Sequence, residues 1–315
     1  MTDILSNSFV SHWRARSLAQ NYGTVLAEVG RVDEAIEVLK KAIAVEPDTG
    51  HEKFMYLSQL TDGEVSIGYS RAGIEILRRC IGEEKDREYA AELKSQLCQA
   101  LCALVEFMLN SSLLSADSPN QAAAPEALRL LDEAERSDPS SPEPWQVRSS
   151  LHVEQGRSED ARAALRKSLS IWYRKGAHGQ GDGDGDGDDD GEGVMMDVDP
   201  QAAASAALPS YEFRFEAAKL VMELEDDARP ALAILEGLLD ESDANLDVWF
   251  LLALCNQGMA QLEEATECLD HIEQAIPGLP SEAPERENLR ALRVDLERIK
   301  TEMAETERQR QSQNQ

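Results

Sequence analysis

The stretch LAQNYGTVLAEVGRVDEAIEVLKKAIAVEP, residues 18–47, predicts two amphipathic helices that meet at Gly30. Gly23 carries no side chain, so the two helices can approach closely at this position, and Ala35 places a small side chain on the second helix. Pro47 ends that helix, because proline lacks a backbone N–H and clashes with the preceding turn. The stretch therefore predicts one tightly packed helical hairpin.

This hairpin recurs along the chain. The segment IEILRRCI at 74–81 matches IEVLKKAI at 36–43 with a shift of 38 residues, which pairs Gly68 with Gly30. Four extra residues are therefore expected between the two helices of the second hairpin, near 62–68. Later copies keep a spacing of 34 residues between their small residues, which are Ala127 and Ala161, then Ala231 and Ala265.

Glycine, alanine, a large apolar residue and proline in this order, at a period near 34 residues, are typical of the tetratricopeptide repeat. We predict an all-α fold, a right-handed tetratricopeptide-repeat solenoid of about six degenerate helical hairpins with a C-terminal capping helix. The last repeat of such an array needs a cap, since it would otherwise expose an apolar face. The stripe expected to cover it consists of Leu289, Leu292, Leu296 and Ile299.

The predicted domain organisation follows from these repeats and from the composition between them. The segments are an N-terminal arm at 1–14, repeats 1–4 at 15–175, an acidic Gly/Asp-rich insertion at 176–210, repeats 5–6 at 211–279, the capping helix at 280–305 and a tail at 306–315. The insertion and the tail are expected to be disordered, because their polar and charged residues offer little to bury.

Negative charge is concentrated in the second half of the chain. The net charge is −29, and 22 of these charges fall between residues 176 and 275, where there are 25 acidic and three basic residues. Such a field repels nucleic acid and anionic membranes and attracts a basic protein. We therefore expect a basic protein partner, no direct nucleic-acid binding and no membrane association.

The insertion also carries part of a calcium-binding pattern. Asp182, Asp184 and Asp186 occupy the first, third and fifth positions of an EF-hand loop. The twelfth position, however, is Gly193 instead of the glutamate that binds calcium through both oxygens, and Asp189 stands where an apolar residue is expected. Diffuse binding of cations or basic peptides fits this segment better than a specific calcium site.

Deletion of residues 176–205 tests this interpretation. We expect the melting temperature to stay within a few degrees of the full chain, since exposed disordered segments contribute little to stability. Thermal unfolding followed by circular dichroism measures this. A large drop, or stabilisation by micromolar calcium, would contradict the prediction.

Signals for catalysis, metals and secretion are weak or missing from the sequence. The histidines are scattered, and no nucleophile elbow, phosphate loop or dinucleotide fingerprint is present. Cys98 and Cys102 share one helix face, but no further ligands stand at zinc spacing, so both are expected in the core. We expect a non-enzyme without cofactor or metal. The five cysteines and the absence of a recognisable signal peptide favour the cytoplasm and nucleus.

Three stretches carry a more specific resemblance. They are KFMYLSQLTDGEVSIGYSRAGIEILRRC at 53–80, EDARAALRKSLSIWYRK at 159–175, and YEFRFEAAKLVMELEDDARPALAILEGLLDESDANLDVWFLLALCNQG at 211–258. Together they resemble the fungal family of dedicated assembly chaperones for large-subunit ribosomal protein four, over roughly residues 15–275. The resemblance implies a chaperone that binds this newly made basic protein through its long internal loop, shields it and escorts it towards pre-ribosome assembly. A monomer that forms a heterodimer with this cargo is expected.

The first helix of each repeat is expected to line a concave groove for this partner. In the last two repeats the groove positions are counted from Phe215 and Trp249, and the same offsets are applied to earlier repeats. The predicted partner-binding residues are Glu28, Glu143, Glu154, Phe213, Glu216, Leu220, Glu223, Asp247, Phe250 and Leu254.

Two other classes of function are considered for the same fold. A co-chaperone that clamps the acidic C-terminus of a heat-shock protein needs Lys and Arg on the groove face, and the predicted positions are acidic or neutral. A scaffold or adaptor subunit of a larger complex remains an alternative that only a partner assay separates from a chaperone.

Overall fold

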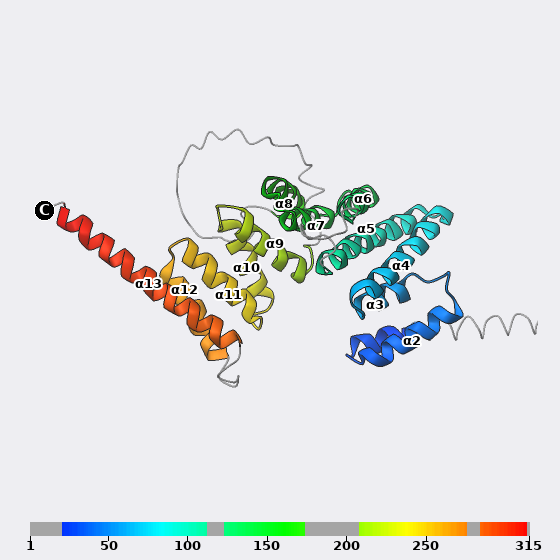
Figure 1. Ribbon diagram of the computed structural model, residues 1–315, viewed down its shortest axis with the longest axis horizontal. Coiled ribbons are helices and arrows are strands. Elements are labelled where there is room, and N and C mark those ends of the chain that lie inside the picture. The colour runs from blue at the N-terminus through cyan, green and yellow to red at the C-terminus, as the bar shows by residue number, and fades with distance from the viewer. Residues whose placement is uncertain (1–20, 112–122, 174–207, 276–283, 314–315) are drawn as a thin grey trace, which may run out of the picture. The chain divides into compact units, whose positions relative to one another are not determined.

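The computed structural model describes residues 21–111, 123–173, 208–275 and 284–313, and all regular elements within them are helices (Figure 1). The predicted arm, most of the acidic insertion and the last two residues lie outside the described residues. The described chain forms two compact units, Met1–Ile171 and Trp172–Gln315, which we call the N-terminal and the C-terminal unit.

The helices follow one another as hairpins. In the N-terminal unit they are the helix at 21–28, which we call the N-terminal helix, followed by α2 (Val32–Val45), α3 (Glu52–Gln59), α4 (Gly63–Glu83), α5 (Arg87–Asn110), α6 (Ala123–Ser137), α7 (Glu143–Glu154) and α8 (Ser158–Trp172). In the C-terminal unit they are α9 (Tyr211–Leu224), α10 (Arg229–Glu241), α11 (Leu246–Gly258), α12 (Leu262–Ala275) and α13 (Pro284–Gln313).

The small residue that marks each predicted repeat is buried in its hairpin. The alanines at this position are Ala35, Ala127, Ala161, Ala231 and Ala265, and the large apolar residues four positions later are Leu39, Leu131, Leu165, Leu235 and Leu269, all of them buried. In the second hairpin Gly73 takes the place of the alanine, and a Cβ atom there would collide with the side chain of Met55. The predicted all-α repeat fold is confirmed.

One detail of the second hairpin differs from the prediction. The extra residues do not lie between the helices, because α4 already begins at Gly63 and Gly68 lies inside it. The turn uses the left-handed conformation of Gly63 (φ 61°), not Gly68. Four residues are close to one helical turn, so α4 gains a turn at its start and still presents Gly73 to α3.

The core of the N-terminal unit lies around α5. This helix packs against α4, α6 and α7, and α7 also packs against α6. A cluster of buried residues joins α4 to α7, including Leu77, Leu101, Leu131 and Leu151. Each first helix thus contacts the second helix of the preceding hairpin, which is how a repeat array builds a continuous core. Cys98 and Cys102 are fully buried there, as predicted.

The turn inside three hairpins requires a left-handed residue. Gly30 (φ 78°) and Gly156 (φ 67°) occupy it in the first and fourth repeats, and Ala260 (φ 59°) occupies the matching position in the sixth. For an L-residue with a Cβ atom, this conformation costs roughly 1 kcal/mol relative to glycine. The sixth repeat therefore keeps a strained turn between α11 and α12.

Replacing Ala260 with Gly is expected to stabilise the C-terminal unit by about 0.5–1 kcal/mol, because the strain disappears and is only partly offset by the greater freedom of the unfolded chain. Urea unfolding of the full chain measures the change. Gly156→Ala is the matched control, and it should destabilise the N-terminal unit. Destabilisation by Ala260→Gly would contradict this account of the turn.

A buried arginine fastens the first hairpin of the C-terminal unit. Arg214 on α9 is almost fully buried; its Nε donates to the carbonyl oxygen of Pro209 at 2.9 Å, and its guanidinium pairs with Glu241 at 2.8 Å. Because Glu241 is the last residue of α10, this side chain ties the start of one helix to the end of its partner. In the next hairpin the Trp249 ring stacks on His271 at 3.9 Å.

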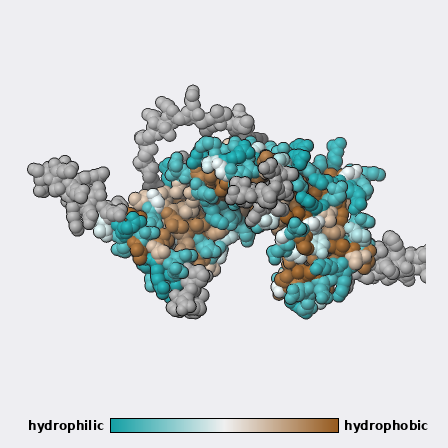
Figure 2. Space-filling view, in the orientation of Figure 1, coloured by the Kyte–Doolittle hydropathy of each residue, from teal (hydrophilic) through white to brown (hydrophobic). Residues whose placement is uncertain are grey.

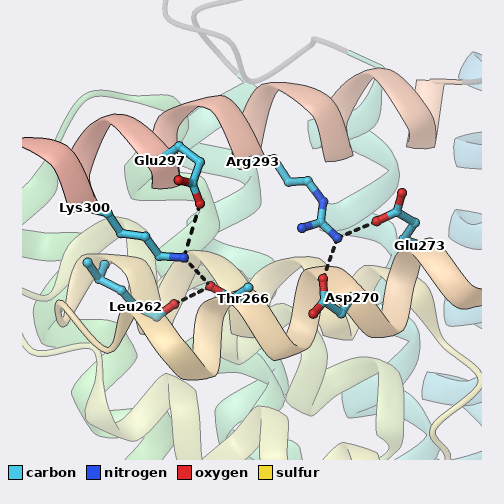
Figure 3. Close-up of polar contacts among 7 residues, drawn as sticks. All are labelled: Leu262, Thr266, Asp270, Glu273, Arg293, Glu297 and Lys300. Atoms are coloured by element: carbon cyan, nitrogen blue, oxygen red, sulfur yellow. Dashed lines mark hydrogen bonds and ion pairs between the residues drawn. The ribbon is translucent and has the colours of Figure 1, made fainter.

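Helix α13 packs along α12 (Figure 1). Leu289 and Leu296 are buried, and polar side chains flank them (Figure 3). Arg293 bridges Asp270 and Glu273 at 2.7 and 2.6 Å, and Lys300 Nζ donates to Thr266 Oγ1 at 2.9 Å.

The last helix is longer than predicted. It continues to Gln313, whereas the sequence led us to expect a disordered tail from residue 306. The segment from 301 to 313 contains no Gly or Pro and is rich in Glu, Arg and Gln, which favour helix.

Candidate partner-binding surfaces

Seven of the predicted partner-binding residues lie on α9 and α11, the first helices of the two hairpins in the C-terminal unit. These helices contact each other directly. Side chains cap both N-termini: Ser210 accepts a hydrogen bond from the Phe213 amide and Asn245 accepts one from the Asp247 amide. The sequence prediction therefore selected residues on two adjacent helices of one unit.

The acidic members of this set are exposed. Glu216 and Glu223 lie one to two turns apart on α9, and Asp247 lies in the first turn of α11. Glu216 pairs with Lys219 at 2.8 Å. An exposed pair of this kind contributes little to stability, so Glu216 can exchange this cation for another at low cost.

The apolar members differ in how much surface they offer. Leu254 on α11 is 42% exposed, and Phe250 is half-buried one turn before it. Phe213 is also half-buried, with its ring edge-on to Trp172 at 5.9 Å. Leu220 is only 8% exposed and contributes to the core, so it has little surface left for a partner. Phe250 and Leu254 are thus the apolar residues best placed for contact.

The few cations of the C-terminal unit are engaged with its acids. Residues 208–275 contain 16 acidic residues and three basic ones. Each basic residue pairs within the unit: Arg214 with Glu241, Lys219 with Glu216 and Arg229 with Asp227. The negative field of this segment is therefore only locally reduced, and it remains available to steer a cationic ligand.

The other three predicted residues lie in the N-terminal unit. Glu28 is exposed at the end of the N-terminal helix, and Glu154 is exposed at the end of α7. Glu143 lies at the start of α7, roughly 16 Å from Glu154 along the axis at 1.5 Å per residue. These residues are spread along the unit, so the structure does not bring them together into one small site.

Glu143 has an unusual environment. Burial raises its pKa to about 7, and repulsion from Glu106 and Asp138 adds to the shift. Glu106 belongs to α5, which packs against α7. Both carboxyl groups also act on the Cys102 thiol, whose pKa is raised mainly by burial. The contact of α5 with α7 therefore holds an acidic pair, Glu106 and Glu143, in a poorly solvated position.

Sequence reasoning missed Glu106. The signal was present, because Cys98, Cys102 and Glu106 are spaced four residues apart and share one face of α5. The third repeat lacks the aromatic anchor from which the groove positions were counted in later repeats, so its first helix received no assignment.

Two kinds of site were also searched for in the described part of the chain. No group of three or more His, Cys, Asp or Glu side chains there is arranged to hold a metal ion. Among the same residues, no helix combines the length and the apolar character needed to cross a membrane.

Comparison with known proteins places the chain among repeat proteins. Residues 17–49 match the family model of the tetratricopeptide repeat. A Schizosaccharomyces pombe protein named "Probable assembly chaperone of rpl4" is 26% identical over 263 residues, which are 78% of this chain and 68% of the relative. An Emericella nidulans protein of the same name is 25% identical over 251 residues, 76% of this chain and 54% of that relative. The chain thus spans about two thirds of one relative and about half of the other.

A solved structure shows the same architecture. The assembly chaperone of RpL4 (Acl4, residues 1–338) superimposes with a TM-score of 0.60 at 24% identity, over 80% of this chain and 86% of that chain. At this identity the likeness establishes the fold. The chain is therefore a tetratricopeptide-repeat solenoid that is similar, over about three quarters of its length, to fungal proteins named as assembly chaperones of rpl4.

Proposed function

We propose that this protein is a dedicated chaperone of a newly made ribosomal protein of the rpl4 type. It binds the basic internal loop of this cargo, shields it and accompanies it towards pre-ribosome assembly. The similarity to two proteins named as assembly chaperones of rpl4 supports the choice of cargo. The observation that carries the proposal is the acidic surface of α9 and α11.

Charge explains why such a surface suits this cargo. A protein segment that contacts RNA phosphates is rich in Lys and Arg, and such a segment cannot bury enough apolar surface to fold by itself. The acids of residues 208–275 outnumber the bases by 13, which attracts a cationic segment over a distance of about one Debye length, ~8 Å at physiological salt. Glu216, Glu223 and Asp247 are the exposed acids that we assign to this contact.

Apolar contacts give the complex its lifetime. Electrostatic complementarity mainly accelerates association, whereas desolvated apolar contacts slow dissociation. Phe250 and Leu254 on α11 supply exposed apolar surface beside Asp247. A basic segment that also carries apolar side chains would fit both features, and a purely polar polycation would fit only the first.

The Glu106–Glu143 pair offers a second contact in the N-terminal unit. A Lys or Arg side chain placed beside these carboxyl groups would relieve their repulsion and stabilise the ionised form of Glu143. We assign Glu28 and Glu154 to weaker, exposed contacts on the same unit.

The same proposal covers assembly state and location. The chain acts as a monomer that forms a heterodimer with its cargo, makes no direct contact with nucleic acid and performs no catalysis. It works in the cytoplasm, where the cargo is made, and in the nucleus, where the cargo joins the pre-ribosome.

A binding assay with the purified full chain tests the proposal. The probe is the rpl4-type ribosomal protein, intact or with its internal loop deleted, and affinity is measured by calorimetry at 50 and 300 mM salt. We expect tight binding of the intact cargo, weaker binding at high salt and a loss of at least tenfold without the loop. Equal affinity for both cargo forms would overturn the loop assignment. No binding of either form, with other proteins recovered by affinity purification, would favour a scaffold subunit instead.

A further inference from the structure

The N-terminal helix carries an apolar face that has no partner among the described residues. Tyr22, Val25 and Val29 follow one another at spacings of three and four residues, so they lie on one side of the helix. All three are more than half exposed. The opposite side packs against α2, where a Cβ on Gly23 would collide with Leu39. We call the exposed residues the N-terminal face; the hairpin lies beside α2 at the lower right of Figures 1 and 2.

The repeat register shows what this face does in other hairpins. Val25 lies ten residues before the alanine of its repeat, and Leu151 on α7 and Cys255 on α11 occupy the same position. These two are 0% and 2% exposed, whereas Val25 is 52% exposed. They are buried because α7 packs on α6 and α11 packs on α10. The N-terminal face is therefore the docking side for a preceding helix.

The segment in the chain best placed to cover this face is the one that directly precedes it. Residues 1–20 join the N-terminal helix without a linker, and they contain Leu5, Phe9 and Trp13 at spacings of four residues. This spacing puts the three side chains on one side of a helix. Being tethered, the segment faces an effective concentration in the millimolar range.

Charge and precedent within the molecule point the same way. Residues 1–20 contain two arginines and one acid, whereas the chain as a whole carries −29, so the segment is attracted to the rest of the protein. In the C-terminal unit, the last hairpin is covered by the chain's own helix α13 through Leu289 and Leu296. An array of repeats needs both ends covered.

We propose that the segment 1–20 docks on the N-terminal face as an N-terminal cap, with Leu5, Phe9 and Trp13 covering Tyr22, Val25 and Val29. The cap closes the first repeat in the way that a preceding hairpin closes α7 and α11. This proposal is independent of the cargo.

Hydrogen exchange of the full chain tests the cap. We expect amides between residues 5 and 13 to exchange at least tenfold more slowly than in Val25→Asp, a variant that places a charge in the middle of the face. The reciprocal variant Phe9→Asp should accelerate exchange in residues 22–29. Val65→Asp is the matched control, since Val65 is an exposed valine on α4 outside the face, and it should leave both segments unchanged.

The alternative occupants give different results. Sedimentation over a range of protein concentrations detects a second copy on the face, as a dimer that Val25→Asp dissociates. Such a dimer would overturn the proposal. Unprotected amides at residues 5–13 in the wild-type chain would overturn it as well, and would leave the face for a separate partner. The Phe9→Asp change lies outside the repeats, so its effect cannot be attributed to a failure of the repeats to fold.

Discussion

Replacing Glu216, Glu223 and Asp247 together with Lys is expected to weaken binding of the rpl4-type cargo by about 30- to 100-fold at low salt. The three exposed acids lie on adjacent helices, and their reversal changes the local charge by six units. If each reversal removes an attraction and adds a repulsion of about 0.3–0.5 kcal/mol, the sum is about 2–3 kcal/mol, and every 1.4 kcal/mol is tenfold in affinity. Calorimetric titration of the full-length variant with intact cargo measures the loss.

A matched control separates position from net charge. Asp240, Glu263 and Glu264 are exposed acids on α10 and α12, the second helices of the same hairpins. Their simultaneous replacement with Lys makes the same change in net charge away from α9 and α11, so it should reduce affinity only a few-fold, through the long-range field. Circular dichroism checks that both variants remain folded. Equal losses in the two variants would show that the cargo responds to total charge, and an unaffected first variant would place the contact elsewhere on the chain.

The repeat framework was predictable because small residues at fixed spacing dictate where helices touch. Ala161 and Leu165, for example, are both completely buried, as their place in the repeat required. The error in the second hairpin arose at the turn. Sequence pairing matched Gly68 to Gly30, but Gly63 can equally supply the left-handed turn, and a full extra helical turn keeps Gly73 in place.

The candidate site was less accessible from sequence. Spacing correctly put Glu216, Asp247 and Leu254 on exposed parts of first helices, but it could not tell that Leu220 is buried. Burial of that residue depends on neighbours from other helices, which spacing along one helix does not contain. For the same reason, the proximity of Glu106 to Glu143 emerges only from the contact between α5 and α7.

Replacing Glu143 with Gln is expected to stabilise the N-terminal unit by roughly 3 kcal/mol at pH 8, taking 1.36 kcal/mol per pKa unit between the ordinary value of 4.5 and about 7 in the folded protein. Below pH 4.5 the carboxyl group is protonated in both the folded and the unfolded chain and carries no penalty. Between pH 4.5 and 7 the unfolded chain releases this proton while the folded chain retains it, so stability falls as pH rises. Above pH 7 the folded chain holds a poorly solvated charge, and the full penalty persists.

Urea unfolding of both proteins at pH 4.5 and pH 8 measures this difference. The stabilisation by Glu143→Gln should be large at pH 8 and close to zero at pH 4.5, whereas Glu154→Gln, an exposed change at the other end of α7, should have little effect at either pH. A stabilisation of equal size at both pH values would assign the effect to packing and not to charge.

Cargo binding adds a second readout for the same residue. If a cationic side chain of the cargo lies beside Glu143 and Glu106, it favours the ionised carboxylate and lowers the pKa of Glu143. Wild-type binding should then release protons near pH 6 and become tighter between pH 6 and pH 8, and Glu143→Gln should abolish that increase. Calorimetric titrations in two buffers of different ionisation enthalpy count the released protons. A pH dependence that persists in Glu143→Gln would exclude this carboxyl group from the cargo contact, while the urea experiment would still determine its effect on stability.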